Sequence, residues 1–143
     1  MLRVLAALLL ASLCPGAWGH DPGISEIKLC IGEAGVLLTW ELASADAHHT
    51  TDVAARWGDT VSPARRTGQS PPSHHQIQRW WEFDANSVPE EIALIGLDTL
   101  PFGHRVVAAI CGSPIETVLS ANDPLWQVST EGVGDDDQRQ ARK

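Results

Sequence analysis

The chain has 143 residues, of which 43% are hydrophobic, and a formal net charge of −8 at pH 7. This length is sufficient for one domain with a core of its own. The chain is acidic and has no basic patch, which argues against nucleic acids and anionic lipid surfaces as ligands, because both attract positive charge.

The first nineteen residues have the pattern of a secretory signal peptide. Arg3 gives a cationic start, residues 4–13 form an apolar run too short to span a membrane, and Ala17 and Gly19 supply small residues for cleavage. We therefore expect residues 1–19 to be removed and a secreted or periplasmic chain, without a membrane span, to begin at His20. The alternative is a lipoprotein anchored at Cys14, which the bulky preceding residue disfavours.

Alternating apolar and polar side chains predict strands in the rest of the chain. Residues 24–31 place Ile27, Leu29 and Ile31 on one face, as in a half-buried strand. A Gly-bounded turn then leads into a return strand over residues 36–42. Further strands are predicted at 76–83, 91–97, 104–111, 115–121 and 125–130. The turn signals between the last four predict that they form a β-meander.

Residues 44–75 lack the alternating pattern of the predicted strands, because polar and turn-forming residues dominate this segment. Asp46 or Thr51 is a candidate cap for a short helix ending at Ala55 or Trp57, and the remainder is predicted to be a long irregular loop. Residues 131–143 are too polar to bury an apolar face, which predicts a disordered acidic tail.

The predicted elements together indicate an all-β domain over residues 20–130. The regular spacing of short strands predicts an immunoglobulin-like β-sandwich of about seven strands with one long loop insertion. A β-barrel is the alternative architecture.

Two cysteines, Cys30 and Cys111, remain after the signal peptide. Cys30 shares the polar face of its strand with Glu26 and Lys28, and Cys111 shares a face with Arg105. A free cysteine tends to be buried, so two cysteines at such positions indicate a disulfide in an oxidising compartment. The bond requires the first strand to lie beside strand 104–111. The alternative is two unrelated buried thiols.

Several short motifs together resemble a known family. They are His-Asp-Pro-Gly-Ile-Ser at 20–25, Ser-Ala-Asp at 44–46, Leu-Pro-Phe-Gly-His-Arg at 100–105 and Leu-Ser-Ala-Asn-Asp-Pro at 119–124. Most of residues 20–130 resembles the extracytoplasmic N-terminal region of bacterial membrane proteins of the HupE/UreJ type, which are hydrogenase and urease accessory, nickel-permease-like proteins. The resemblance places a membrane protein among the candidate partners. Nickel transport is not carried over, because the membrane helices of that family have no counterpart here.

His20 and His104 are the first candidate metal ligands. A histidine at a mature N-terminus offers an α-amine and an imidazole, and His104 would add a second imidazole to complete a brace for copper or nickel. The alternative is that His20 is a solvated terminus and His104 a hydrogen-bonded turn residue.

Two further histidine pairs flank the polar segment, namely His48, His49, His74 and His75. Their imidazoles can gather around a metal ion only if the two ends of the segment lie close together. The alternative is that they are solvated polar residues.

Trp80 and Trp81 point to opposite sides of their predicted strand, with Trp81 in the core. Trp80 is a candidate for stacking on a sugar or a partner, or alternatively for packing at a sheet edge. No serine lies in a nucleophile elbow and no glycine-rich phosphate loop is present.

These patterns predict a non-catalytic domain that binds an unknown partner protein, with a membrane protein among the candidates, or a transition-metal ion such as Cu or Ni. One alternative is a copper-dependent oxidative enzyme that uses His20. The other is a carbohydrate-binding module that uses Trp80.

Overall fold

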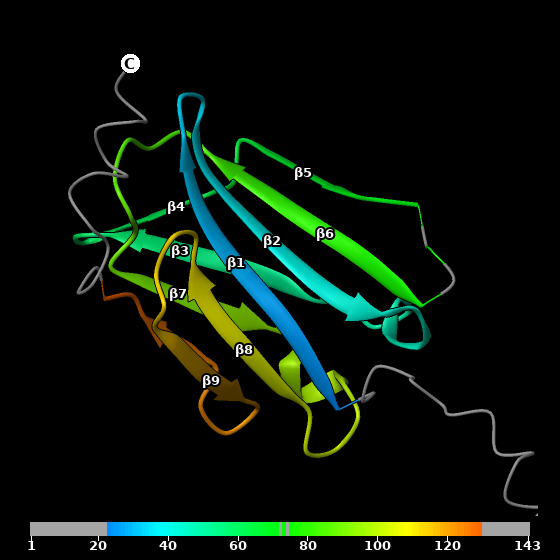
Figure 1. Ribbon diagram of the computed structural model, residues 1–143. Helices are drawn as coiled ribbons and strands as arrows, with labels where there is room; N and C mark the ends of the chain where they lie inside the picture. The colour runs from blue at the N-terminus through cyan, green and yellow to red at the C-terminus, as the bar shows by residue number, and fades with distance from the viewer. Residues whose placement is uncertain (1–22, 72, 74, 130–143) are drawn as a thin grey trace, which may run out of the picture.

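The computed structural model describes residues 23–71, 73 and 75–129. These residues form ten strands and two short 3-10 turns (Figure 1). In chain order the elements are β1 (Ile24–Gly32), β2 (Gly35–Ala43), η1 (Ser44–Asp46), β3 (Asp52–Trp57), β4 (Thr60–Ser62), β5 (Arg66–Gln69), β6 (Gln76–Phe83), β7 (Glu91–Ile95), η2 (Leu97–Thr99), β8 (Arg105–Ile110), β9 (Glu116–Ser120) and β10 (Leu125–Gln127).

The strands form two sheets that lie face to face (Figure 1). The larger sheet has the order β5-β6-β2-β1-β8-β9, and the smaller sheet has the order β10-β7-β3-β4. The β1–β8 pair is parallel, whereas the other pairs are antiparallel. This arrangement confirms the all-β sandwich, and the narrower immunoglobulin-like assignment stays a prediction.

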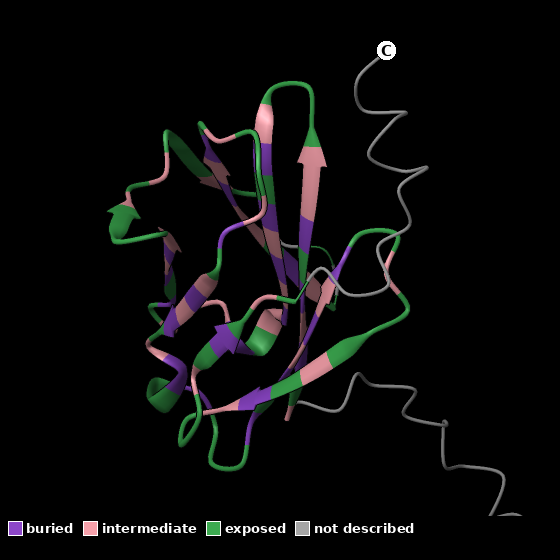
Figure 2. Cartoon of the chain, turned by 90° about the vertical axis from the view of Figure 1, so that its left-hand side faces the viewer, coloured by how far each residue is buried: buried purple, intermediate pink, exposed green. Residues whose placement is uncertain are grey.

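The core lies between the inner faces of the two sheets, where buried positions alternate with more exposed ones along most of the strands (Figure 2). In β1, Ile27 and Leu29 are fully buried, while Lys28 between them is exposed. In β2, Leu38 and Trp40 follow the same two-residue period. In β1 and β2 the apolar periodicity of the sequence therefore sets the face that the strand turns inward.

The polar segment 44–75 is not one long loop, because it contains three strands. Val53 and Ala55 of β3 are buried in the core, so the expected helix ending near Ala55 is replaced by a strand. The strand β3 pairs with β7 in the centre of the smaller sheet. β4 then pairs with β3, and β5 pairs with β6 in the other sheet.

The predicted β-meander over the last four strands is wrong. Only β8 and β9 are neighbours in the larger sheet, whereas β7 and β10 pair with each other in the smaller sheet. The turn Asn122-Asp123-Pro124 carries the chain from one sheet to the other, and it begins with a bridge between Ser120 and Asp123. A turn signal marks a change of direction, but it does not determine which strand becomes the neighbour.

One ion pair joins β3 and β7 on the outer face of the smaller sheet. Arg56 donates to Glu91 from Nε to Oε1 at 3.3 Å and from Nη2 to Oε2 at 3.0 Å. Gln127 of β10 also donates from its Nε2 to Oε2 of Glu91 at 2.6 Å. The hydrogen bond from Arg56, followed by that from Gln127, lowers the pKa of Glu91 below its ordinary value of 4.5.

We expect Glu91→Gln to lower the melting temperature at pH 7 and to lower it less at pH 3, where a larger share of the Glu91 carboxyl group is protonated. A carboxylate whose pKa is lowered by folding stabilises the protein above its unfolded pKa, and this contribution disappears as the pH falls through the folded pKa. Thermal unfolding at the two pH values measures the difference. Glu33→Gln, in the exposed β1–β2 turn, is the matched control. An equal loss at both pH values would contradict the electrostatic explanation.

Candidate functional site

His104 belongs to a buried hydrogen-bonded network. Its Nε2 lies 2.9 Å from Ser25 Oγ, and Trp40 Nε1 donates to the same hydroxyl at 2.9 Å. The side chains of His104 and Ser25 are 3% and 4% exposed, respectively, and Trp40 is fully buried. The network ties β1, β2 and the start of β8 together inside the sandwich.

This network bears on the predicted metal brace. Nε2 of His104 is hydrogen-bonded to Ser25 Oγ, so this hydrogen bond would have to break before Nε2 could bind a metal ion. His20 lies outside the described residues, so its pairing with His104 stays a prediction. Within the described part of the chain, no group of three or more His, Cys, Asp or Glu side chains is placed to hold a metal ion.

The two ends of the polar segment do lie close together. Ser44 N donates to His75 O at 3.0 Å, and Ser44 Oγ donates to Ser73 O at 3.0 Å. The rings of His48 and His49 lie 4.0 Å apart between centroids. His74 lies outside the described residues, so the four-imidazole site stays a prediction.

The disulfide between Cys30 and Cys111 is confirmed. The two Cα atoms lie 5.0 Å apart, and the parallel pairing of β1 with β8 brings them together. Cys111 N also donates to Leu29 O at 2.8 Å, which continues the ladder just beyond β8. The covalent bond joins positions that are 81 residues apart in the chain.

Trp80 packs at the sheet edge rather than standing free. It lies opposite Gly68 of β5, and a Cβ atom built on Gly68 would come within 2.3 Å of the indole carbon Cζ2. The missing side chain of Gly68 therefore makes room for the ring. Trp81 points inward and is 4% exposed, as its strand pattern predicts.

A cleft of about 470 Å³ lies at the end of the sandwich where β8 begins. Residues from the segments 97–105 and 118–122 form it, and we call it the end cleft. Phe102 stands beside it with a fully exposed side chain, and Val118 on the edge strand β9 is 57% exposed. Asp98, Arg105 and Asn122 contribute polar groups to the same lining.

Phe102 is exposed because of the turn that carries it. His104 N donates to Pro101 O at 3.0 Å, and Gly103 adopts a φ of 81°, which a glycine takes without strain. Leu100 on one side and His104 on the other are buried, so they hold the turn against the core. Phe102 remains at the tip. In the sequence, this stretch was a turn signal and part of a family motif, but Phe102 was not singled out, although a phenylalanine at a turn tip was the available signal.

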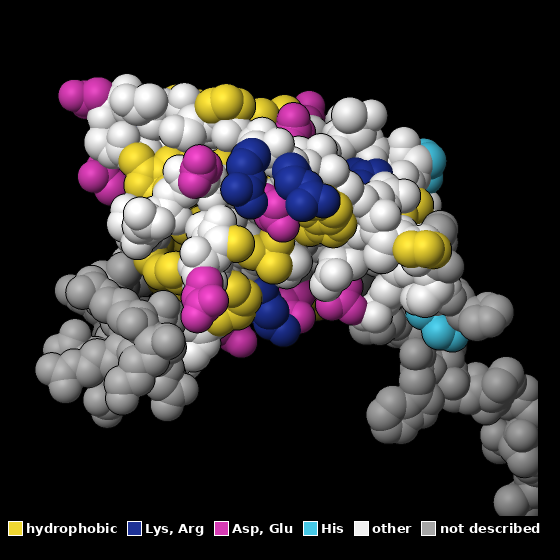
Figure 3. Space-filling view, turned by 90° about the horizontal axis from the view of Figure 1, so that it is seen from above, with side chains coloured by type: hydrophobic (Ala, Val, Ile, Leu, Met, Phe, Trp, Pro, Cys, Tyr) yellow, Lys and Arg dark blue, Asp and Glu magenta, His cyan; other side chains and the backbone are white. Residues whose placement is uncertain are grey.

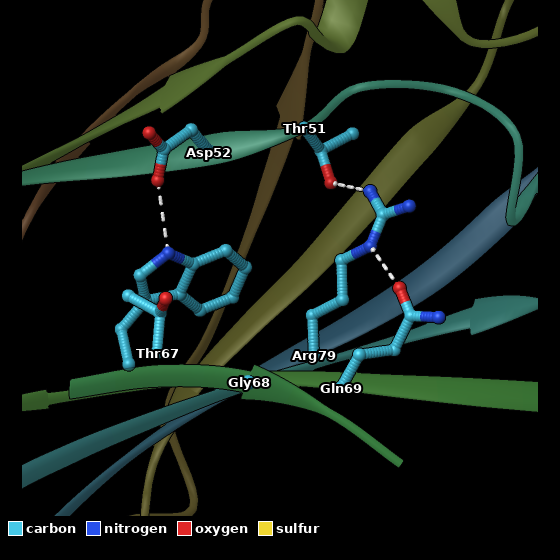
Figure 4. A pocket seen from close by; sticks show the side chains of 7 residues that line it. Thr51, Asp52, Thr67, Gly68, Gln69 and Arg79 are labelled. Carbon is cyan, nitrogen blue, oxygen red and sulfur yellow. Dashed lines mark hydrogen bonds between the residues drawn. The ribbon is translucent and has the colours of Figure 1, made fainter. Parts of the chain in front are cut away.

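A second, more open cleft of about 350 Å³ lies between the two sheets, at the side where β5 forms the edge. Thr51 and Asp52, the segment 67–69, Arg79 and Trp81 line it (Figure 4), and we call it the side cleft. The sequence pattern contained a signal for it, because Arg79 interrupts the apolar series of Ile77, Trp81 and Phe83 on the inward face of its strand.

No family model matches the chain, and no curated protein shows significant similarity to it. The described residues include no helix that is long and apolar enough to cross a membrane. In the view of Figure 3, Lys and Arg side chains lie among Asp and Glu side chains and form no continuous basic patch on that face.

Proposed function

We propose that this protein is a non-catalytic domain that acts outside the cytoplasm and binds a partner protein through the end cleft. The observation that carries the proposal is the fully exposed side chain of Phe102 beside a cleft that both apolar and polar side chains line. An exposed aromatic side chain at such a position has the chemistry of an interface anchor.

The energetics favour occupation of this surface. Burying a phenylalanine side chain that is otherwise in water is worth about 1.5–3 kcal/mol. Val118 adds apolar area on the neighbouring edge strand, while Asp98 and Arg105 offer charges of both signs in the same cleft. Such a combination suits a partner that presents apolar side chains surrounded by polar groups.

The location outside the cytoplasm rests on the signal-peptide pattern of residues 1–19, with the Cys30–Cys111 disulfide as a weaker support. The resemblance to HupE/UreJ-type membrane proteins rests on short motifs, and two of these, at 100–105 and 119–124, supply much of the end cleft. It supports a partner in the bacterial envelope.

We expect Phe102→Ser to raise the dissociation constant of the complex about 30-fold, which corresponds to about 2 kcal/mol for an interface anchor. The partner purified together with the wild-type protein serves as the ligand in a titration. Val61→Ser is the matched control, because Val61 is 61% exposed but lies in β4 of the other sheet. Equal affinities of the wild type and both variants would refute the end cleft as the binding surface.

A further inference from the structure

The inner face of the sandwich is polar at the side cleft. The register pairs Thr67 with Trp81 and Gln69 with Arg79, so all four side chains belong to the inward face of the β5–β6 pair. Apolar side chains make up most of the core elsewhere, and the buried Ser25 and His104 are polar exceptions. A cation between the sheets requires partners, because moving a charge away from water is costly.

The partners of Arg79 are neutral oxygen atoms. Its Nη1 donates to His49 O at 2.8 Å and to the hydroxyl of Thr51, and its Nη2 donates to Ala47 O at 2.8 Å. Its Nε donates to Gln69 Oε1 at 3.1 Å. Since each terminal nitrogen of a guanidinium carries two hydrogens, these bonds leave one hydrogen of Nη2 for a further acceptor.

No carboxylate of the described residues forms an ion pair with this guanidinium. Asp52 lines the same cleft, but its Oδ1 accepts hydrogen bonds from Trp81 Nε1 at 2.9 Å and from Val53 N at 2.8 Å. Figure 4 shows Arg79 between Thr51 and Gln69, whereas the Asp52 carboxylate points to the indole nitrogen of Trp81. Desolvation by the surrounding protein lowers the pKa of Arg79, as expected for a cation without a counter-ion.

We propose that the side cleft binds a small molecule through a single carboxylate, which would pair with Arg79. Thr51 and Thr67 place hydroxyl groups in the same cleft. A charge-assisted bond to a carboxylate is stronger than the bonds to neutral oxygens that Arg79 makes now. A volume of about 350 Å³ admits a small organic acid. The negative charge of Asp52 in the same cleft disfavours a dianion such as phosphate. The site is separate from the end cleft and does not depend on the partner-binding proposal.

Butyrate is the probe for a test by NMR, with butyramide as its uncharged isostere and inorganic phosphate as the competing anion. The signals to follow are the Nε–H group of Arg79 and the Nε1–H group of Trp81. We expect a saturable shift with butyrate, on the order of millimolar affinity, and none with butyramide or phosphate. No saturable shift with butyrate, or tighter binding of phosphate, would overturn the proposal.

Gln69→Glu tests the role of Arg79 without removing its hydrogen bonds. The new carboxylate has the shape of the amide it replaces and would lie 3.1 Å from Nε, where it supplies the missing counter-ion from within the chain. We expect at least a tenfold loss of butyrate affinity in a folded variant. Asn86→Asp adds the same charge in the exposed β6–β7 turn and should bind butyrate as the wild type does. Equal affinity in the two variants would refute the site.

Discussion

Replacing both cysteines by serine, Cys30→Ser with Cys111→Ser, is expected to lower the free energy of unfolding by about 4 kcal/mol. The bond closes a span of 81 residues, so it removes many conformations from the unfolded chain. Cys111 is exposed and Cys30 is half-buried, so the substitution creates little cavity. The expected loss therefore comes mainly from the covalent constraint.

Urea unfolding of the oxidised wild type and of the double variant measures this difference. The reduced wild type is the natural control, because it should unfold at nearly the same urea concentration as the double variant. Loss of the bond should also raise the m-value, since an unconstrained unfolded chain exposes more surface. A double variant as stable as the oxidised wild type would contradict a stabilising role of the disulfide.

Replacing Trp40 by alanine is expected to lower the free energy of unfolding by about 4 kcal/mol, within the usual range for a large aromatic side chain in a core. Trp40 is fully buried, and its ring centroid lies 6.5 Å from that of Trp81. Its loss leaves a cavity and removes the hydrogen bond to the hydroxyl that Ser25 shares with His104.

The matched control is Leu37→Ala, because Leu37 lies on the outer face of the same strand and is 37% exposed. We expect it to cost about 1 kcal/mol or less. Denaturation curves of the two variants and the wild type give the comparison. Similar losses for both substitutions would show that the inward and outward faces of β2 are not energetically distinct.

The sequence predicted those strands in which apolar and polar residues alternate over many positions. The alternation in β1 and β2 identified their buried faces, and it also placed Cys30 on the outer face with its charged neighbours. Because Cys111 had the same character, a disulfide was expected, and the pairing of β1 with β8 was the condition that this disulfide required. A covalent requirement of this kind carries long-range information that local periodicity lacks.

The strands of the polar segment 44–75 could not be predicted from such an alternation. β5 consists of Arg66, Thr67, Gly68 and Gln69, so it has no apolar residue to reveal a period. It becomes a strand because β6 offers it a sheet edge and because Gly68 admits the ring of Trp80. Such tertiary contacts override local propensity.

Among the candidate site residues, too, the sequence identified side-chain chemistry but not the tertiary position. The histidines were candidate ligands because imidazole binds metal ions. In the structure, however, His104 takes part in a buried network with Ser25 and Trp40. Phe102 and Arg79 have ordinary side chains whose importance depends on where the fold places them. The sequence pattern places Phe102 at a turn and Arg79 on an inward face, but the exposure of Phe102 and the cleft around Arg79 are tertiary properties, which one sequence does not display.

The most direct measurement of the partner-binding proposal is photo-crosslinking in the producing cell. A photoreactive benzoyl-phenylalanine replaces Phe102 in one strain and Val61 in a second, and the adducts are resolved by mass after irradiation. The account predicts a discrete adduct with one envelope protein from position 102 and none from position 61. Absence of an adduct at position 102, or the same adducts at both positions, would contradict a specific binding surface at the end cleft.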